Sequence, residues 1–128
     1  MNTVPATVDS AGAPATFRTH GGAPFRAAMS VPASDVGGTV TLGVRPEDLT
    51  VTDGPGLFTG EITLVEKLGE VTLLYVEAGH TEPIVAKVDG DAAFVRGETV
   101  SLTAPMDRLH VFDGSGRAYQ RLEAAQAA

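Results

Sequence analysis

Cysteine and tryptophan are absent from this sequence of 128 residues, and its only lysines are Lys67 and Lys87. Without cysteine the chain has no disulfide framework, no thiol nucleophile and no thiolate metal site. Because the net charge is −7, the polyanionic backbone of a nucleic acid would be repelled on average. An aromatic content of 5% leaves no stacking platform for bases. Nucleic acid is therefore not an expected partner.

Long apolar runs and a phosphate-binding loop are also missing. No apolar stretch approaches the roughly 20 residues that cross a bilayer, and the N-terminus lacks the basic start and apolar middle of a signal peptide. We therefore expect no direct membrane insertion and a cytoplasmic location. No glycine is followed by lysine, so the loop that cradles nucleotide phosphates in P-loop ATPases is absent. This chain alone is not expected to be an enzyme that hydrolyses ATP.

Other catalytic and metal-binding patterns are weak. The three histidines, His20, His80 and His110, are far apart and show no zinc-ligand spacing. No serine occupies the G-x-S-x-G context of a nucleophile elbow. We therefore assign no catalytic, metal-binding or cofactor-binding residue to this chain.

Glycine and proline, 15 and 8 residues, recur between short apolar runs rich in Val, Thr and Leu, which is typical of an all-β domain. Gly69 and Glu70 separate the two clearest strands, and Gly69 is expected to supply the positive φ of a hairpin turn. Ser34 and Asp35 are expected to cap one helical turn over residues 32–36. Strands are expected at residues 16–19, 25–29, 40–44, 50–52, 61–68, 71–77, 83–88, 100–103 and 109–112.

The ends of the chain differ from this pattern. Residues 1–15, rich in Ala, Pro, Thr and Val, are expected to be an extended or partly disordered lead-in. Residues 16–121 form the expected domain, in which a turn at residues 113–116 leads into an extended segment at 117–120. Residues 122–128 favour a helix but are too few to hold one, so we expect a frayed tail.

One rigid corner lies at residues 42–48, where an apolar strand meets a proline and two acids. Pro46 fixes its own φ and disfavours the helical region for Arg45, so strand pairing ends there. Pro46, Glu47 and Asp48 suit the first turn of a short helix, where carboxylates meet the positive end of the dipole. Arg45 and Glu47 are expected to be exposed. From local chemistry alone the corner is simply a turn that joins two strands.

Several segments resemble one known family in the family's order and spacing. The corner and its flanks, residues 43–49 (GVRPEDL), resemble the signature of the C-terminal regulatory domain in ATPase subunits of sugar-importing ABC transporters. This domain is the TOBE, or transport-associated OB, domain of the maltose and sn-glycerol-3-phosphate type. Residues 60–69 (GEITLVEKLG) and 72–76 (TLLYV) are similar to its central hairpin. Residues 97–102 (GETVSL) and 108–113 (RLHVFD) are similar to its closing strands.

The resemblance implies an OB-fold-like small barrel of antiparallel strands, with an additional strand layer and at most short helical turns. It implies a regulatory and dimerisation domain for carbohydrate or glycerol-phosphate uptake, located at the inner face of the plasma membrane. Its partners would be a second copy, the nucleotide-binding domain and the membrane permease subunits. ATP and magnesium would belong to the missing nucleotide-binding domain. Gly43, Arg45, Pro46 and Glu47 would form the family motif and interdomain contact.

A dimerisation role requires an apolar patch on the surface of rigid strands. Two pairs of apolar residues are candidates for this patch: Leu57 with Phe58, after a Gly- and Pro-containing turn, and Val111 with Phe112, in the closing strands. The alternative for each of these residues is ordinary core packing.

A second functional hypothesis is a small-ligand module of the TOBE/MOP type, because related OB-type domains in molybdate and sulfate transport bind oxyanions. Such a site needs convergent N–H groups and a cation. Arg45 and Lys67 are the candidate cations, although the net charge of −7 opposes an anionic ligand at long range.

Overall fold

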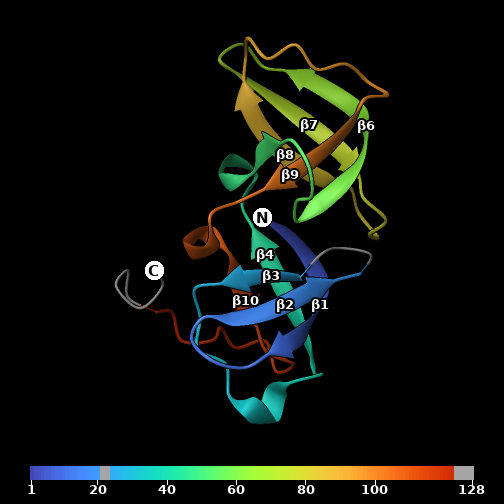
Figure 1. Cartoon of the computed structure of the whole chain (residues 1–128). Helices are drawn as coiled ribbons and strands as arrows, with labels where there is room; N and C mark the ends of the chain where they lie inside the picture. Colours follow the sequence, from blue (N-terminus) through green and yellow to red (C-terminus); the bar gives the residue numbers. More distant parts are fainter. Residues whose placement is uncertain (21–23, 123–128) are drawn as a thin grey trace. The chain divides into compact units, whose positions relative to one another are not determined.

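The computed structural model describes residues 1–20 and 24–122 (Figure 1). Within them every regular element is a strand or a short 3₁₀ turn, which confirms the predicted all-β class. No helix in these ranges is long and apolar enough to cross a membrane. The elements are β1 (Asn2–Ser10), β2 (Ala15–Thr19), β3 (Pro24–Ala27), η1 (Ala33–Asp35), β4 (Thr39–Val44), η2 (Pro46–Asp48), β5 (Thr50–Thr52), β6 (Phe58–Lys67), β7 (Val71–Glu77), β8 (Ile84–Asp89), β9 (Thr99–Thr103), η3 (Met106–Arg108) and β10 (His110–Phe112).

The chain forms two compact units, each built around one five-stranded sheet. Unit 1 comprises Met1–Asn2 and Arg45–Ala104, and its sheet has the order β5-β9-β6-β7-β8. Unit 2 comprises Thr3–Val44 and Pro105–Ala128, and its sheet has the order β10-β4-β1-β2-β3. Most of unit 1 is therefore inserted in the sequence between β4 and β10, two strands that pair with each other in unit 2.

The hairpin of β6 and β7 contains the two longest strands of unit 1. Gly69 has a φ of +94°, as the turn required, and the Leu68 N–H donates to the Val71 carbonyl at 2.9 Å. Alternate side chains of β7 are buried, because successive residues of a strand point to opposite faces. The buried core of unit 1 includes Ile62, Thr72, Leu74, Val76, Ala86 and Leu102.

Unit 2 contains a separate core. Phe17 of β2 is fully buried and stacks on Phe25 of β3, with their ring centroids 5.7 Å apart. Leu42 of β4 and Val111 of β10 are paired in register and both fully buried. The pair of Leu42 and Val111 joins two strands that are far apart in the sequence.

The N-terminal segment is an integral strand and not a separate lead-in. β1 lies between β4 and β2 in the sheet of unit 2, and Val4, Ala6 and Val8 are buried at alternate positions. The pairing of β1 with β2 begins at Ala6, so Pro5 removes no donor from that ladder. Of the two alternatives expected for residues 1–15, extended or partly disordered, residues 2–10 are extended, as a strand of the sheet.

The remaining strands agree with the predicted ones to within three residues at each end. The helical turn at residues 32–36 forms as η1, but without a side-chain cap, so the capping role predicted for Ser34 and Asp35 is wrong. Residues 117–120 form no strand beyond an isolated bridge between Phe112 and Ala118. The tail predicted at residues 122–128 lies, apart from Leu122, outside the described residues.

Candidate functional site

The corner that the sequence predicted is present. β4 ends at Val44, Arg45 is extended with φ −77° and ψ 145°, and Pro46 occupies the first turn of η2. The N–H of Asp48 donates to the Arg45 carbonyl at 3.0 Å, which closes the turn. Arg45 and Glu47 are exposed, while Gly43 is buried in its strand. The corner therefore presents two opposite charges on a short, fixed piece of backbone.

A surface hollow of about 390 Å³ adjoins this corner within unit 1. It holds one cation, Lys87, and two acids, Glu47 and Asp89, over an apolar floor. The excess of acid makes it a poor oxyanion site. The two cations of the small-ligand hypothesis, Arg45 and Lys67, are exposed and do not line it. Its lining residues are Glu47, Leu49, Thr50, Val71, Lys87, Val88 and Asp89.

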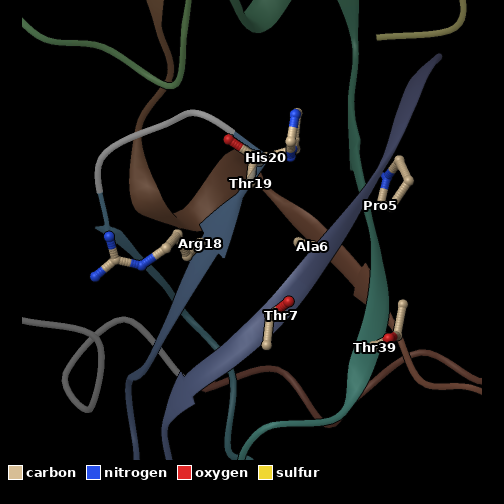
Figure 2. A pocket seen from close by; sticks show the side chains of 7 residues that line it. All are labelled: Pro5, Ala6, Thr7, Arg18, Thr19, His20 and Thr39. Carbon is tan, nitrogen blue, oxygen red and sulfur yellow. The ribbon is translucent and has the colours of Figure 1, made fainter. Parts of the chain in front are cut away.

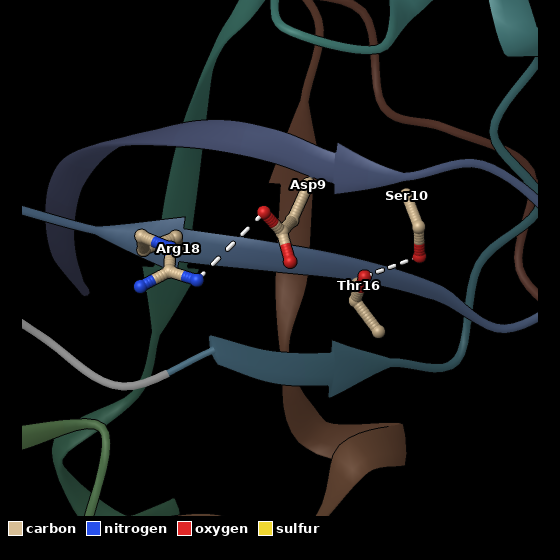
Figure 3. A network of polar contacts seen from close by, with 4 residues as sticks. All are labelled: Asp9, Ser10, Thr16 and Arg18. Atoms are coloured by element: carbon tan, nitrogen blue, oxygen red, sulfur yellow. Dashed lines mark hydrogen bonds and ion pairs between the residues drawn. The ribbon is translucent and has the colours of Figure 1, made fainter.

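A second hollow, of about 410 Å³, lies on unit 2 (Figure 2). Figure 2 shows the Arg18 side chain extending away from Pro5 and Thr39. Arg18 is paired with Asp9 at 3.9 Å, and both side chains are about half exposed (Figure 3). An exposed pair of this kind contributes little stability, but it partly neutralises the cation. The lining residues are Pro5, Ala6, Thr7, Arg18, Thr19, His20 and Thr39.

A hydrogen bond between hydroxyls braces the same pair of strands. The hydroxyls of Ser10 and Thr16 bond across β1 and β2 beside the ion pair, as Figure 3 shows. Together with the ion pair, this bond joins β1 to β2 on the solvent-facing side of the sheet. The arrangement suits structural support of unit 2, because its polar groups are already engaged with one another.

The three histidines have different environments. His20 lines the second hollow, His80 lies edge-on to the Phe58 ring at 5.7 Å, and the Nδ1 of His110 is 2.9 Å from Nη2 of Arg121. Among the residues that the structure describes, no cluster of three or more His, Asp or Glu side chains could hold a metal ion.

A polar network in unit 2 fixes the segment after β10. The Tyr119 hydroxyl donates to Oδ2 of Asp35 at 2.7 Å, and burial together with this carboxylate raises the Tyr119 pKa well above its usual range. The Asp113 carboxylate accepts bonds from Ser115 and Arg117, and these bonds lower its pKa. The sequence had indicated a turn here, but not the contact between Tyr119 and Asp35, whose residues are 84 positions apart.

The residues proposed as a dimer surface are largely core. Leu57, Phe58 and Val111 are 6%, 3% and 0% exposed, and only Phe112 is partly exposed. Phe58 begins β6 opposite Leu102, and Val111 of the edge strand β10 is paired with Leu42 and fully buried. Leu57, Phe58 and Val111 therefore do not form the exposed patch that was expected. Large apolar side chains that are exposed include Val36 (48%), Leu64 (49%), Leu68 (57%) and Val95 (60%).

Two family models match parts of this sequence. The TOBE domain model matches residues 42–112, and the MalK OB fold domain model matches residues 1–49. These matches confirm the family that the corner and hairpin segments suggested.

Relatives with a curated name are ATP-binding proteins of importers. The alpha-glucoside transport ATP-binding protein AglK of Rhizobium meliloti (strain 1021) is 43% identical over 122 residues, which is 94% of this chain and 34% of that protein. The sn-glycerol-3-phosphate import ATP-binding protein UgpC of the same strain is 37% identical, over 71% of this chain and 28% of that protein. The maltose/maltodextrin import ATP-binding protein MalK of Aliivibrio fischeri (strain ATCC 700601 / ES114) is 37% identical, over 67% and 24%. The chain thus spans about one third or less of the length of these relatives.

Among solved structures, the cytoplasmic molybdate-binding protein ModG, crystallised with molybdate bound, has a similar fold. The TM-score is 0.70 at 16% sequence identity, and the match covers 86% of this chain and 94% of that one. At this identity the similarity supports the TOBE/OB fold, and it does not transfer the ligand.

Proposed function

Because this chain belongs to the TOBE domain family, we propose that it is the regulatory and dimerisation domain of an importer's ATP-binding subunit. The observation that carries the proposal is the match to AglK, which covers nearly all of this chain but one third of that protein. The chain is a TOBE domain and not itself a nucleotide-binding domain. The solute class would be a carbohydrate or glycerol phosphate, as the names of AglK, UgpC and MalK suggest.

In this role the domain works with a nucleotide-binding domain and permease subunits at the inner face of the membrane, and it performs no catalysis alone. The corner is the proposed contact with the nucleotide-binding domain. Arg45 and Glu47 are exposed there, and neither forms an ion pair or a side-chain hydrogen bond with another of the residues that the structure describes. Gly43 and Pro46 set the backbone that presents them. Charges on a stiff corner suit docking, since little conformational freedom is lost on binding.

The test compares Arg45→Ala and Glu47→Ala in this chain with the same changes in a full-length subunit that carries it. In the isolated domain each change is expected to alter the free energy of unfolding by less than about 0.5 kcal/mol. In the full-length subunit, transport-coupled ATP hydrolysis should fall. Arg96→Ala is the matched control, because Arg96 is another exposed arginine of unit 1. Strong destabilisation of the isolated domain would show that the corner is mainly internal structure.

Sedimentation of the isolated domain tests the dimerisation role. We expect a monomer in dilute solution and a dimer at high concentration, because the full-length subunit adds further contacts and tethering raises the effective concentration. A strict monomer up to millimolar concentration would remove the main support for this role. In calorimetric titration, ATP should give no saturable heat, and neither should molybdate or sulfate, since Arg45 and Lys67 do not line the hollows described above.

A further inference from the structure

The strand registers place two central rows of three residues each on the outer face of β6, β7 and β8, and Glu61, Val71, Glu77 and Asp89 continue this face at its two ends. In the first row Tyr75 is paired with Leu64 on one side and with Val85 on the other. In the second row Leu73 is paired in the same way with Glu66 and Lys87. Paired residues share a face, and Leu73 and Tyr75 are two positions apart, so both rows lie on one face. We call this set, Leu64, Glu66, Leu73, Tyr75, Val85 and Lys87, the β6–β8 face.

Burial distinguishes this face from the opposite one. The residues that point the other way, Thr72, Leu74 and Ala86, are 0% exposed and belong to the core of unit 1. On the β6–β8 face Leu64 is 49% exposed, and Leu73, Tyr75 and Val85 are partly exposed. A strip of leucine, tyrosine and valine side chains on the outer face of a sheet is the kind of patch that marks an interaction site.

The second row carries one acid and one base and is self-complementary, while Glu61, Glu77 and Asp89 add negative charge at the ends of the face. Glu66 and Lys87 lie on either side of Leu73, two strand spacings or roughly 10 Å apart. The Tyr75 hydroxyl donates to Oε1 of Glu66 at 3.3 Å, which holds that carboxylate over the apolar strip. A two-fold axis that runs parallel to β7 between the two faces, at Leu73, would bring Glu66 of one copy opposite Lys87 of the other, twice. In this arrangement the second row fits the same row of a second copy.

The edge of the same sheet is less available for association. At β8, Oδ1 of Asn2 accepts from the Val85 N–H at 2.8 Å, and Nδ2 of Asn2 donates to the Val85 carbonyl at 2.9 Å. The side-chain amide thereby occupies both backbone groups that an added strand would use at this position. The other edge strand, β5, has only three residues. Packing of face on face is therefore favoured over joining of edges.

We propose that the β6–β8 face is the surface through which two copies of this domain associate, with Leu64, Leu73, Tyr75 and Val85 at the centre and Glu66 and Lys87 at the rim. The proposal rests on the dimerisation role proposed above and names its surface. It replaces the surface expected from Leu57, Phe58, Val111 and Phe112.

The experiment measures the dimer dissociation constant of this chain by sedimentation equilibrium. Leu64→Glu should raise it at least about a hundredfold, because a charge is then buried twice in a two-fold contact. Val36→Glu is the matched control, since Val36 is 48% exposed but belongs to unit 2. Circular dichroism checks that both variants keep the β fold.

Charge reversal tests the two-fold arrangement. Glu66→Lys and Lys87→Glu should each weaken the dimer roughly tenfold, because each turns two rim attractions into repulsions. The double variant should regain most of the wild-type affinity. A wild-type dimer that Leu64→Glu leaves intact would overturn the β6–β8 face and leave the dimerisation role standing. Absence of any wild-type dimer up to millimolar concentration would instead overturn the dimerisation role itself.

Discussion

Replacing Thr72 by valine should make this protein more stable. Thr72 is 0% exposed, and its Oγ1 finds no hydrogen-bond partner among the described residues. A buried hydroxyl without a partner costs about 1–3 kcal/mol of desolvation. Valine has nearly the same shape and is also β-branched, so Thr72→Val should keep the strand conformation and remove that cost.

We expect a gain of about 1 kcal/mol in the free energy of unfolding for Thr72→Val, which corresponds to about 4 °C in Tm for a domain of this size. Urea denaturation measures it as a higher midpoint with an unchanged m value. Thr59→Val is the matched control, because the Thr59 hydroxyl is exposed and bonds to that of Ser101 at 2.8 Å. The control should change stability by less than about 0.5 kcal/mol or lower it slightly. A loss of 1 kcal/mol or more for Thr72→Val would refute the reasoning, since it would mean that the hydroxyl is satisfied.

Three further substitutions test other contacts. Gly60→Ala should destabilise the protein by more than about 2 kcal/mol, because the added Cβ would lie 2.0 Å from the Glu77 carbonyl oxygen. In the control variant, Gly114→Ala, the atom nearest to the added Cβ is 3.9 Å away. Equal melting temperatures for the two variants would contradict this prediction. Asn2→Ala should lower the free energy of unfolding by about 1–2 kcal/mol, because both hydrogen bonds to the Val85 backbone are lost. An unchanged denaturation midpoint would show that these two bonds do not stabilise the protein. The pKa of Asp113 is lowered in the folded state, so its contribution to stability is present above the unfolded pKa of about 3.9 and is lost as the pH falls through the lower, folded pKa. Asp113→Asn should therefore reduce stability at pH 7, and its difference from wild type should shrink below about pH 4 in thermal melts; a constant difference across that range would exclude this linkage.

Local signals in the sequence were sufficient for much of the fold. Pro46 with its two acids predicted η2, and Gly69 predicted the hairpin turn, because both depend on backbone preferences within a few residues. The composition of residues 1–15 indicated an extended or partly disordered segment but not that it pairs in a sheet, because the pairing of β1 depends on strands distant in the sequence.

The functional surface was harder to predict. The apolar residues of the β6–β8 face are of the same types as the buried Leu57, Phe58 and Val111. Only the pairing of distant strands decides which side chains face a core. The bulge between Ile62 and Leu64 illustrates the problem. It shifts the register within β6, so the apolar alternation read along the sequence does not show that Leu64 points to solvent.

The sequence insertion between β4 and β10 has a consequence for how this family can diversify. Gly43 and His110 lie opposite each other in the sheet of unit 2, so the host sheet itself brings together the two ends of the inserted segment. The TOBE domain match, residues 42–112, begins in β4 and ends in β10 and thus comprises the insert with its paired flanks. Because the entropy of closing a loop grows slowly with length, by about 0.6 kcal/mol per doubling, such an insert can lengthen, shorten or be exchanged at small cost to its host. The binding surfaces of unit 1 can therefore change while the sheet of unit 2 stays the same.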